Sequence, residues 1–305
     1  MAFLFPGQGS VFPRMGEDLC KVWPAARSVY ETFSAVSGVN VAAISFSRDI
    51  RPIRKVETAH LAIFTHSCAV FAVLDREGGP DFAAGHSLGE LSAIVAAGAV
   101  SVSEGLRLVK RRGELLRDCC QQKSGGMVAV RGVPLQAVET AVRKVGGLHT
   151  VRVANFNGPG EFVLSGEQEG LRETARDLRL RGALVRHLDV EGAFHSPLME
   201  TAARAFAKEI NGVTFKDPQF PVISSSTGEI LTTARSVRDE LTGHILEPVR
   251  WDLVLQTLTE LGVDLWIEVG PGKVLTSFIQ RQDRGARAYC TTSAAALAKV
   301  CERLE

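Results

Sequence analysis

The chain has 305 residues, of which 45% are hydrophobic and 23% charged, a composition typical of a globular protein that buries a sizeable core. Its 35 basic and 34 acidic residues leave a formal net charge of +1, which argues against a nucleic-acid footprint or an electrostatic membrane anchor. The six cysteines form no Cys-x-x-Cys pair, so we expect no metal cluster or disulfide framework, and no apolar run is expected to reach the roughly 18 residues that span a bilayer.

The first part of the chain predicts strands and helices in alternation. Residues 2–5 predict a buried strand that is too short for a signal peptide and lacks a basic leader, so a cytoplasmic protein is expected. Residues 21–36 and 58–76 predict helices, the second with apolar residues at helical spacing. Glycine and proline at residues 78–80 end that helix, and a short strand then leads to Gly85.

Residues 85–89 form a Gly-x-Ser-x-Gly turn between that strand and a helix predicted to begin at Leu88. Two glycines tolerate a crowded turn that pushes the Ser87 hydroxyl out above a sheet edge. The new helix would direct free N–H groups at whatever lies over that serine. Such a nucleophile elbow suits acyl transfer, although the pattern alone also fits an ordinary strand-to-helix turn with a capping serine.

The rest of the chain predicts a large and a small unit. A helix that Ser101 or Ser103 could cap runs to about residue 120, and a polar break follows at residues 121–126. Over residues 127–189 the order strand, helix, strand, strand, helix, strand predicts a ferredoxin-like unit. Beyond residue 192 helices and strands alternate again, and residues 270–273 open a further helix. This alternation predicts an α/β protein with a mostly parallel sheet.

A serine nucleophile needs a base, and His195 stands apart among the seven histidines because of its setting. It lies in a glycine-containing loop just before a helix that opens at Ser196, with Pro197 at the first helical position. Loops of this kind are where α/β sheets place ligands.

Seven stretches, in order along nearly the whole chain, carry a family resemblance. They are Phe5-Pro6-Gly7-Gln8-Gly9-Ser10, Gly85-His86-Ser87-Leu88-Gly89-Glu90, Arg112-Gly113, Asn155-Phe156-Asn157-Gly158-Pro159-Gly160, Gly192-Ala193-Phe194-His195-Ser196, Pro248-Val249-Arg250-Trp251 and Glu268-Val269-Gly270-Pro271-Gly272. Together they resemble the malonyl-CoA:acyl-carrier-protein transacylase family, including the free-standing acyltransferases of polyketide synthases. The resemblance implies a hydrolase-like, mostly parallel core from residues 1–124 and 191–305, with a ferredoxin-like small subdomain inserted at residues 125–190.

The resemblance also implies roles for individual residues. Ser87 would carry the acyl group as an ester, and His195 would be first its general base and then the acid that protonates the leaving thiolate. The backbone N–H groups of Gln8 and Leu88 would form the oxyanion hole. Arg112 would hold the free carboxylate of a malonyl or alkylmalonyl group with two parallel hydrogen bonds.

Further residues bear on the acyl group. Phe194 and His86 are expected among the substrate-binding residues, and Phe194 favours malonyl over bulkier groups, as does Leu88 after the nucleophile. Two histidines depart from the family pattern. His244 stands where Gln or Asn is usual, near a backbone carbonyl that orients the catalytic histidine, and a second imidazole there could alter the pKa of His195. His60 stands where a Thr-Gln-Pro-like run is common, so both leave the acyl specificity open.

We expect an enzyme that transfers a malonyl group from CoA to the phosphopantetheine thiol of an acyl carrier protein through a seryl-ester intermediate. No metal or redox cofactor is implied, CoA is part of the substrate, and a monomer is expected. The family works with a Ser–His dyad, so Asp189 and Glu191 are not expected to be catalytic. Basic residues would dock the acidic carrier protein, and charge reversals without effect on the rate would contradict this; the candidates are Arg179, Arg181, Arg186 and Arg281.

Other readings stay open. The same reaction could use another acyl group, such as methylmalonyl, and the pathway could be fatty-acid or polyketide synthesis. The chain could be an editing hydrolase that strips acyl groups from carrier proteins, although Arg112 would then have no carboxylate to hold. It could also be a non-catalytic docking module, although such a scaffold need not retain both Ser87 and His195.

Overall fold

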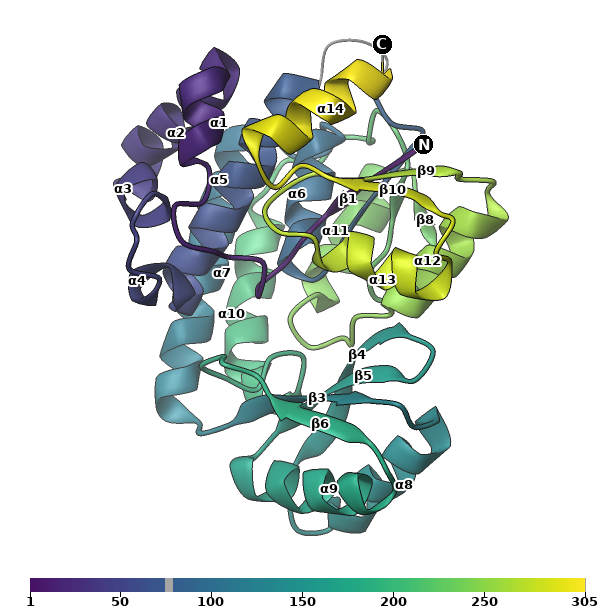
Figure 1. The fold of residues 1–305 in the computed structure, drawn as a ribbon. Coiled ribbons are helices and arrows are strands. Elements are labelled where there is room, and N and C mark those ends of the chain that lie inside the picture. The colour runs from purple at the N-terminus through teal and green to yellow at the C-terminus, as the bar shows by residue number, and fades with distance from the viewer. Residues whose placement is uncertain (75–78, 305) are drawn as a thin grey trace.

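The large sheet of this α/β protein is mostly parallel, as predicted (Figure 1). The structure is a computed structural model that describes residues 1–74 and 79–304. Six strands lie in the order β10-β9-β1-β2-β7-β8, and only β7 and β8 pair antiparallel. Their bounds are β1 Ala2–Phe5, β2 Phe82–Gly85, β7 Val222–Ile223, β8 Ile230–Leu231, β9 Leu265–Glu268 and β10 Arg287–Cys290. The sequence did not predict β8 or β10.

Helices cover both faces of this sheet because alternate side chains of β1 enter two different cores. Phe3 and Phe5 belong to the larger core, whereas Ala2 and Leu4 belong to the core that contains Trp251. The helices of this part are α1 Glu17–Val22, α2 Pro24–Ser37, α3 Val41–Ser45, α4 Arg51–Arg54, α5 Val56–Leu74, α6 Leu88–Ala96, α7 Val102–Gln122, α10 Glu200–Asn211, α11 Ala234–Gly243, α12 Trp251–Glu260, α13 Val274–Gln282 and α14 Ala294–Leu304, with a 3₁₀ turn, η1, at Pro197–Met199. The burial of both faces explains why the strands read as continuous apolar runs.

Helix α5 corrects the expectation that no apolar run is long enough to span a bilayer. By length and composition it could cross a membrane, with 19 residues and a mean hydropathy of 1.3 over its best window. However, 72% of that window is buried inside the molecule, as in the core helix of a globular protein. The last two residues of the predicted helix 58–76 lie outside the described residues.

The small sheet has the strand order of a ferredoxin-like unit. Its order is β4-β5-β3-β6, with all pairs antiparallel, and helices α8 and α9 pack together on it. The bounds are β3 Gly126–Arg131, α8 Leu135–Val145, β4 Val151–Gly158, β5 Glu161–Gly166, α9 Gln168–Leu180 and β6 Leu184–His187. In Figure 1 this unit lies below the large sheet. The division of the chain at residues 124 and 191 stays a proposal.

The helix predicted over residues 21–36 is in fact two helices. Helix α1 ends at Val22 and α2 begins at Pro24, with Trp23 extended between them at φ −112° and ψ 107°. Proline has no N–H to donate into a preceding turn and disfavours a helical conformation in the residue before it. Pro24 is therefore the first residue of a new helix rather than an interior residue of one.

Ser101 is the residue that caps α7. Its hydroxyl accepts a hydrogen bond from the Glu104 N–H at 3.3 Å, whereas Ser103 lies inside the helix. We expect Ser101→Ala to lower the free energy of unfolding by about 1 kcal/mol. Denaturant unfolding would measure it, with Ser103→Ala as the matched control. An equal loss in both variants would contradict the assignment of the cap.

Candidate active site

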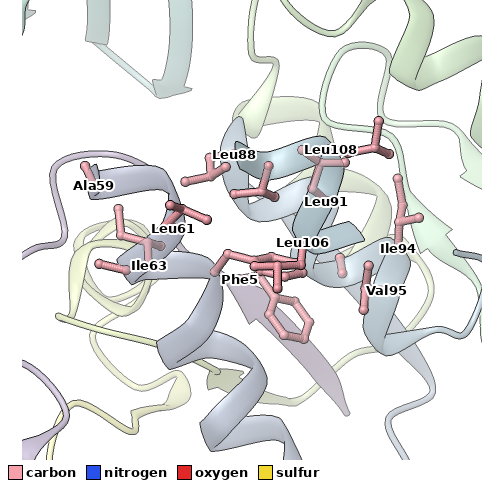
Figure 2. Packing of buried hydrophobic residues seen from close by; sticks show 14 of the residues in the cluster. Phe5, Ala59, Leu61, Ile63, Leu88, Leu91, Ile94, Val95, Leu106 and Leu108 are labelled. Carbon is pink, nitrogen blue, oxygen red and sulfur yellow. The ribbon is translucent and has the colours of Figure 1, made fainter. Parts of the chain in front are cut away.

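The nucleophile elbow is built by two glycines that leave no room for a side chain. A Cβ on Gly85 would lie 2.1 Å from backbone atoms of Gly89 and Glu90, and one on Gly89 would lie 2.0 Å from the Phe5 carbonyl oxygen. Between them Ser87 has φ 50° and ψ −116°, a strained backbone for a residue with a side chain. The packing of α6 against β1 and α5 stabilises this backbone conformation. Figure 2 shows that packing around Phe5, Leu61 and Leu88.

The structure brings His195 to Ser87 across 108 residues of sequence. The Ser87 Oγ lies 2.7 Å from His195 Nε2. His195 Nδ1 lies 2.7 Å from the backbone carbonyl oxygen of Glu247, which only accepts, so Nδ1 carries the proton and donates it. Nε2 then carries a free lone pair that faces the serine hydroxyl, which is the arrangement that a general base requires.

His195 is neutral in this site. Its imidazole is 4% exposed, and burial lowers its pKa to about 3, helped by the positive charge of Arg112 and opposed by the bond to Glu247. Neither nearby acid contacts it: Asp189 pairs with Arg54 at 2.7 Å, and the Glu191 carboxylate accepts from the Val56 N–H at 2.8 Å. The backbone carbonyl of Glu247 therefore takes the place that a triad acid would hold.

Arg112 is a buried cation beside the nucleophile. It is 3% exposed, and burial lowers its pKa to about 10, which still leaves it charged at neutral pH. Its Nη2 donates to Ser87 Oγ at 3.3 Å and its Nη1 donates to His60 Nε2 at 3.2 Å. Among the described residues Nε has no hydrogen-bond partner, and no carboxylate forms an ion pair with the guanidinium. Such a group can bind a carboxylate that enters the site.

His60 supports Arg112 as a neutral imidazole. Its Nε2 accepts from the guanidinium, and burial together with the charge of Arg112 lowers its pKa well below the ordinary value. Neither His60 nor His244 lines the cavity over Ser87; both are buried behind it, at 0% and 2% exposure. His60 and His244, the two departures from the family pattern, thus contact Arg112 and the nucleophile loop and do not form the cavity wall.

A cavity of about 610 Å³ opens over Ser87, between the two sheets. The predicted residues Gln8, His86, Arg112, Phe194 and His195 line it with Ser87, whereas Leu88 is fully buried beneath it. A volume of this size holds an extended group much larger than malonyl. The lining also includes Glu161, Asp189 and five exposed basic residues, which are Arg54, Arg131, Arg186, Lys273 and Arg281. Of the four predicted docking arginines, Arg179 and Arg181 lie outside this lining.

The two predicted oxyanion donors come from different segments that pack tightly together. A Cβ on Gly7 would lie 2.3 Å from the His86 carbonyl oxygen, so glycine lets the Gln8 loop approach the elbow. Leu88 is the first residue of α6, where a backbone N–H has no acceptor within the helix. His86 is fixed from the other side by a 3.0 Å hydrogen bond from its Nε2 to Asn157 Oδ1.

The fold and this site are those of an acyltransferase. A family model described as the acyl transferase domain matches residues 2–299. The malonyl CoA-acyl carrier protein transacylase of Bacillus subtilis strain 168 is 36% identical over 290 residues, 93% of this chain and 90% of that protein. The enzyme of the same name from Escherichia coli K12 is 32% identical over 283 residues, 92% of each chain.

Solved structures agree with the sequence relatives. One is a malonyl-transacylase in complex with a type II polyketide synthase acyl-carrier protein, with a TM-score of 0.95, 31% identity and 99% of both chains covered. The malonyl CoA-acyl carrier protein transacylase of Coxiella burnetii has a TM-score of 0.94 at 27% identity, covering 99% of this chain and 97% of that one. The chain belongs to the malonyl-CoA:acyl-carrier-protein transacylase family.

Proposed function

We infer that the protein moves a malonyl group from CoA to the phosphopantetheine thiol of an acyl carrier protein. The observation that carries the choice of acyl group is Arg112, a buried cation that lies 3.3 Å from the nucleophile and forms no ion pair with a carboxylate of the described residues. Malonyl supplies a carboxylate two carbons from the thioester carbonyl, whereas acetyl and longer monocarboxylic groups supply none. Phe194, which lines the cavity, is the residue expected to favour malonyl over bulkier groups.

In the first half-reaction the Ser87 oxygen attacks the thioester carbonyl carbon while its proton passes to His195 Nε2. The resulting oxyanion accepts hydrogen bonds from the backbone N–H groups of Gln8 and Leu88, each worth on the order of 3 kcal/mol. Collapse breaks the carbon–sulfur bond, and His195 gives its proton to the departing CoA thiolate. Malonyl is left as an ester on Ser87.

In the second half-reaction the carrier protein's thiol enters the place that CoA has left. His195 takes the thiol proton, the thiolate attacks the ester carbonyl, and the same two N–H groups hold the oxyanion. Collapse returns the proton from His195 to the Ser87 oxygen and releases the malonyl thioester. This route uses groups of the chain and its substrates alone and needs no further cofactor.

Intact-mass spectrometry tests the proposal directly. Incubation with malonyl-CoA should add one malonyl group to Ser87, and holo carrier protein should then remove it as a thioester. Absence of the adduct would overturn the acyltransferase, and prompt loss to water alone would favour the editing hydrolase. A docking module would neither form the adduct nor release CoA. The cytoplasmic location and the monomeric state remain part of the proposal, which fractionation and light scattering check.

The pH dependence of acylation follows from the pKa of His195. A base must be unprotonated, and with a pKa of about 3 in the free enzyme it stays so well below its ordinary 6.5. Because kcat/KM reports the groups of the free enzyme, we expect its value for malonyl-CoA to change by no more than about 2-fold between pH 8 and pH 5. Stopped-flow release of CoA measures this, with circular dichroism at each pH as the control for folding. A fall centred near pH 6.5 would contradict the prediction.

A further inference from the structure

His244 is a buried histidine that the proposed chemistry does not use. It follows α11 directly and is 2% exposed. Its ring lies 6.4 Å from that of His195, centroid to centroid, but the two make no hydrogen bond. Burial and the charge of Arg112 lower its pKa well below the ordinary value, so the imidazole is neutral.

The hydrogen-bond partner of His244 shows which ring nitrogen carries the proton. Its Nε2 lies 2.9 Å from the backbone carbonyl oxygen of Ser87, which has no hydrogen to give. Nε2 therefore carries the hydrogen and donates it, while the buried Nδ1 has no hydrogen-bond partner among the described residues. The contact spans 157 residues of sequence and ends on the nucleophile's own backbone.

The bonded carbonyl belongs to the peptide unit that also carries a predicted oxyanion donor. Ser87 C=O and Leu88 N–H lie in one rigid plane and point in opposite directions within it, because the peptide bond is planar and trans. A hydrogen bond that fixes the carbonyl on one side therefore fixes the direction of the N–H on the other. The Ser87 carbonyl also accepts from the Glu90 N–H at 2.9 Å, so two donors hold it.

A buried carboxyl group lies beside the same nitrogen. Glu90 Oε2 lies 3.4 Å from His244 Nε2, and both oxygens of Glu90 accept from Ser225, from its N–H and its hydroxyl, at 2.8 Å each. Since Ser87 has a positive φ that its side chain disfavours, the loop needs such outside support to keep one orientation.

We propose that His244 is a positioning residue whose Nε2–H holds the Ser87–Leu88 peptide plane so that the Leu88 N–H faces the developing oxyanion. This rests on the proposed function. Its consequence is specific: losing the donor slows bond making at Ser87 without weakening the binding of malonyl-CoA, because His244 does not line the cavity.

The test compares His244→Leu, which removes the donor, with His244→Gln, whose amide N–H can reach the same carbonyl. In single-turnover acylation by malonyl-CoA, we expect His244→Leu to lose roughly 10- to 100-fold in rate, as for a misdirected oxyanion donor, with KM changed by less than about 2-fold. His244→Gln should recover to within about 5-fold of the native rate. His244→Met, also without a donor, replaces the leucine variant if that one fails to fold.

His66→Leu is the matched control, because His66 is another fully buried imidazole, bonded to the Tyr30 hydroxyl at 3.1 Å, away from Ser87. It should cost stability but leave the acylation rate of the folded protein unchanged. A native rate in folded His244→Leu or His244→Met would overturn the proposal, as would an equal loss in the glutamine variant. If the native protein formed no adduct on Ser87, the proposed function would fail instead, which separates the two.

Discussion

Ser87→Ala is expected to abolish the covalent malonyl adduct and to lower kcat/KM for transfer by at least about 10⁴-fold, as for other serine nucleophiles that act together with a base. The hydroxyl lies 2.7 Å from His195 Nε2, and among the described residues no other hydroxyl forms a hydrogen bond with that nitrogen. Without the oxygen no ester forms, although the cavity and Arg112 still bind substrate. Intact mass after incubation and a CoA-release assay measure the two losses.

The effects of replacing Ser87 and His195 should also be non-additive. His195→Ala removes the proton acceptor, so we expect Ser87→Ala with His195→Ala to be no slower than either single variant. Ser92→Ala is the control, because Ser92 is a buried serine of α6, the helix that follows Ser87, and its hydroxyl has no hydrogen-bond partner among the described residues. An adduct on Ser87→Ala, or independent losses that multiply in the double variant, would show that another group is the nucleophile.

The elements that the sequence predicted are those with local signals. Gly85 and Gly89 predict the elbow because the turn itself leaves no room for a side chain at either position. The small sheet follows from six short elements in a recognisable order. Pro24 also carried a local signal, since proline favours the first turn of a helix, and the break in residues 21–36 was predictable from it.

What the sequence could not predict depends on contacts between distant segments. The family resemblance implied that a backbone carbonyl near His244 orients His195, but not which one. It is that of Glu247, and every residue has such a carbonyl, so no residue type marks it. That carbonyl is held in place by the next strand-like segment, where Val249 pairs with β4 through the N–H groups of Val249 and Phe156. From the sequence, His244 raised questions about the pKa of His195 and the acyl specificity, whereas its contact is with the carbonyl of Ser87.

Arg112→Ala is expected to change which acyl group the enzyme accepts. Truncating one partner of a buried charge pair costs about 3 kcal/mol, so kcat/KM for malonyl-CoA should fall roughly 100-fold or more. The same variant should lose little with acetyl-CoA, since acetyl brings no carboxylate and a buried unpaired cation is removed from the site. The ratio of malonyl-CoA to acetyl-CoA loading, measured in competition by intact mass, reports the switch.

A second effect of Arg112 enlarges the preference for malonyl. Its charge is the second cause, after burial, that lowers the pKa of His195. A substrate carboxylate bound to the guanidinium offsets that charge and raises the pKa of His195 toward its ordinary value, which makes His195 a stronger base when malonyl is present. Acetyl-CoA provides no such compensation, so it should be slow with the native enzyme even at saturation.

Arg112→Lys distinguishes carboxylate recognition from charge alone. An ammonium group keeps the charge but cannot make two parallel hydrogen bonds, so we expect it to recover less than about a tenth of the malonyl activity. Arg111→Gln is the matched control, because the neighbouring Arg111 pairs with Glu209 on the half-exposed face of α7 and should leave the selectivity unchanged. If Arg112→Ala slowed malonyl-CoA and acetyl-CoA equally, Arg112 would serve to order Ser87 and His60, and the choice of acyl group would have to lie elsewhere in the cavity.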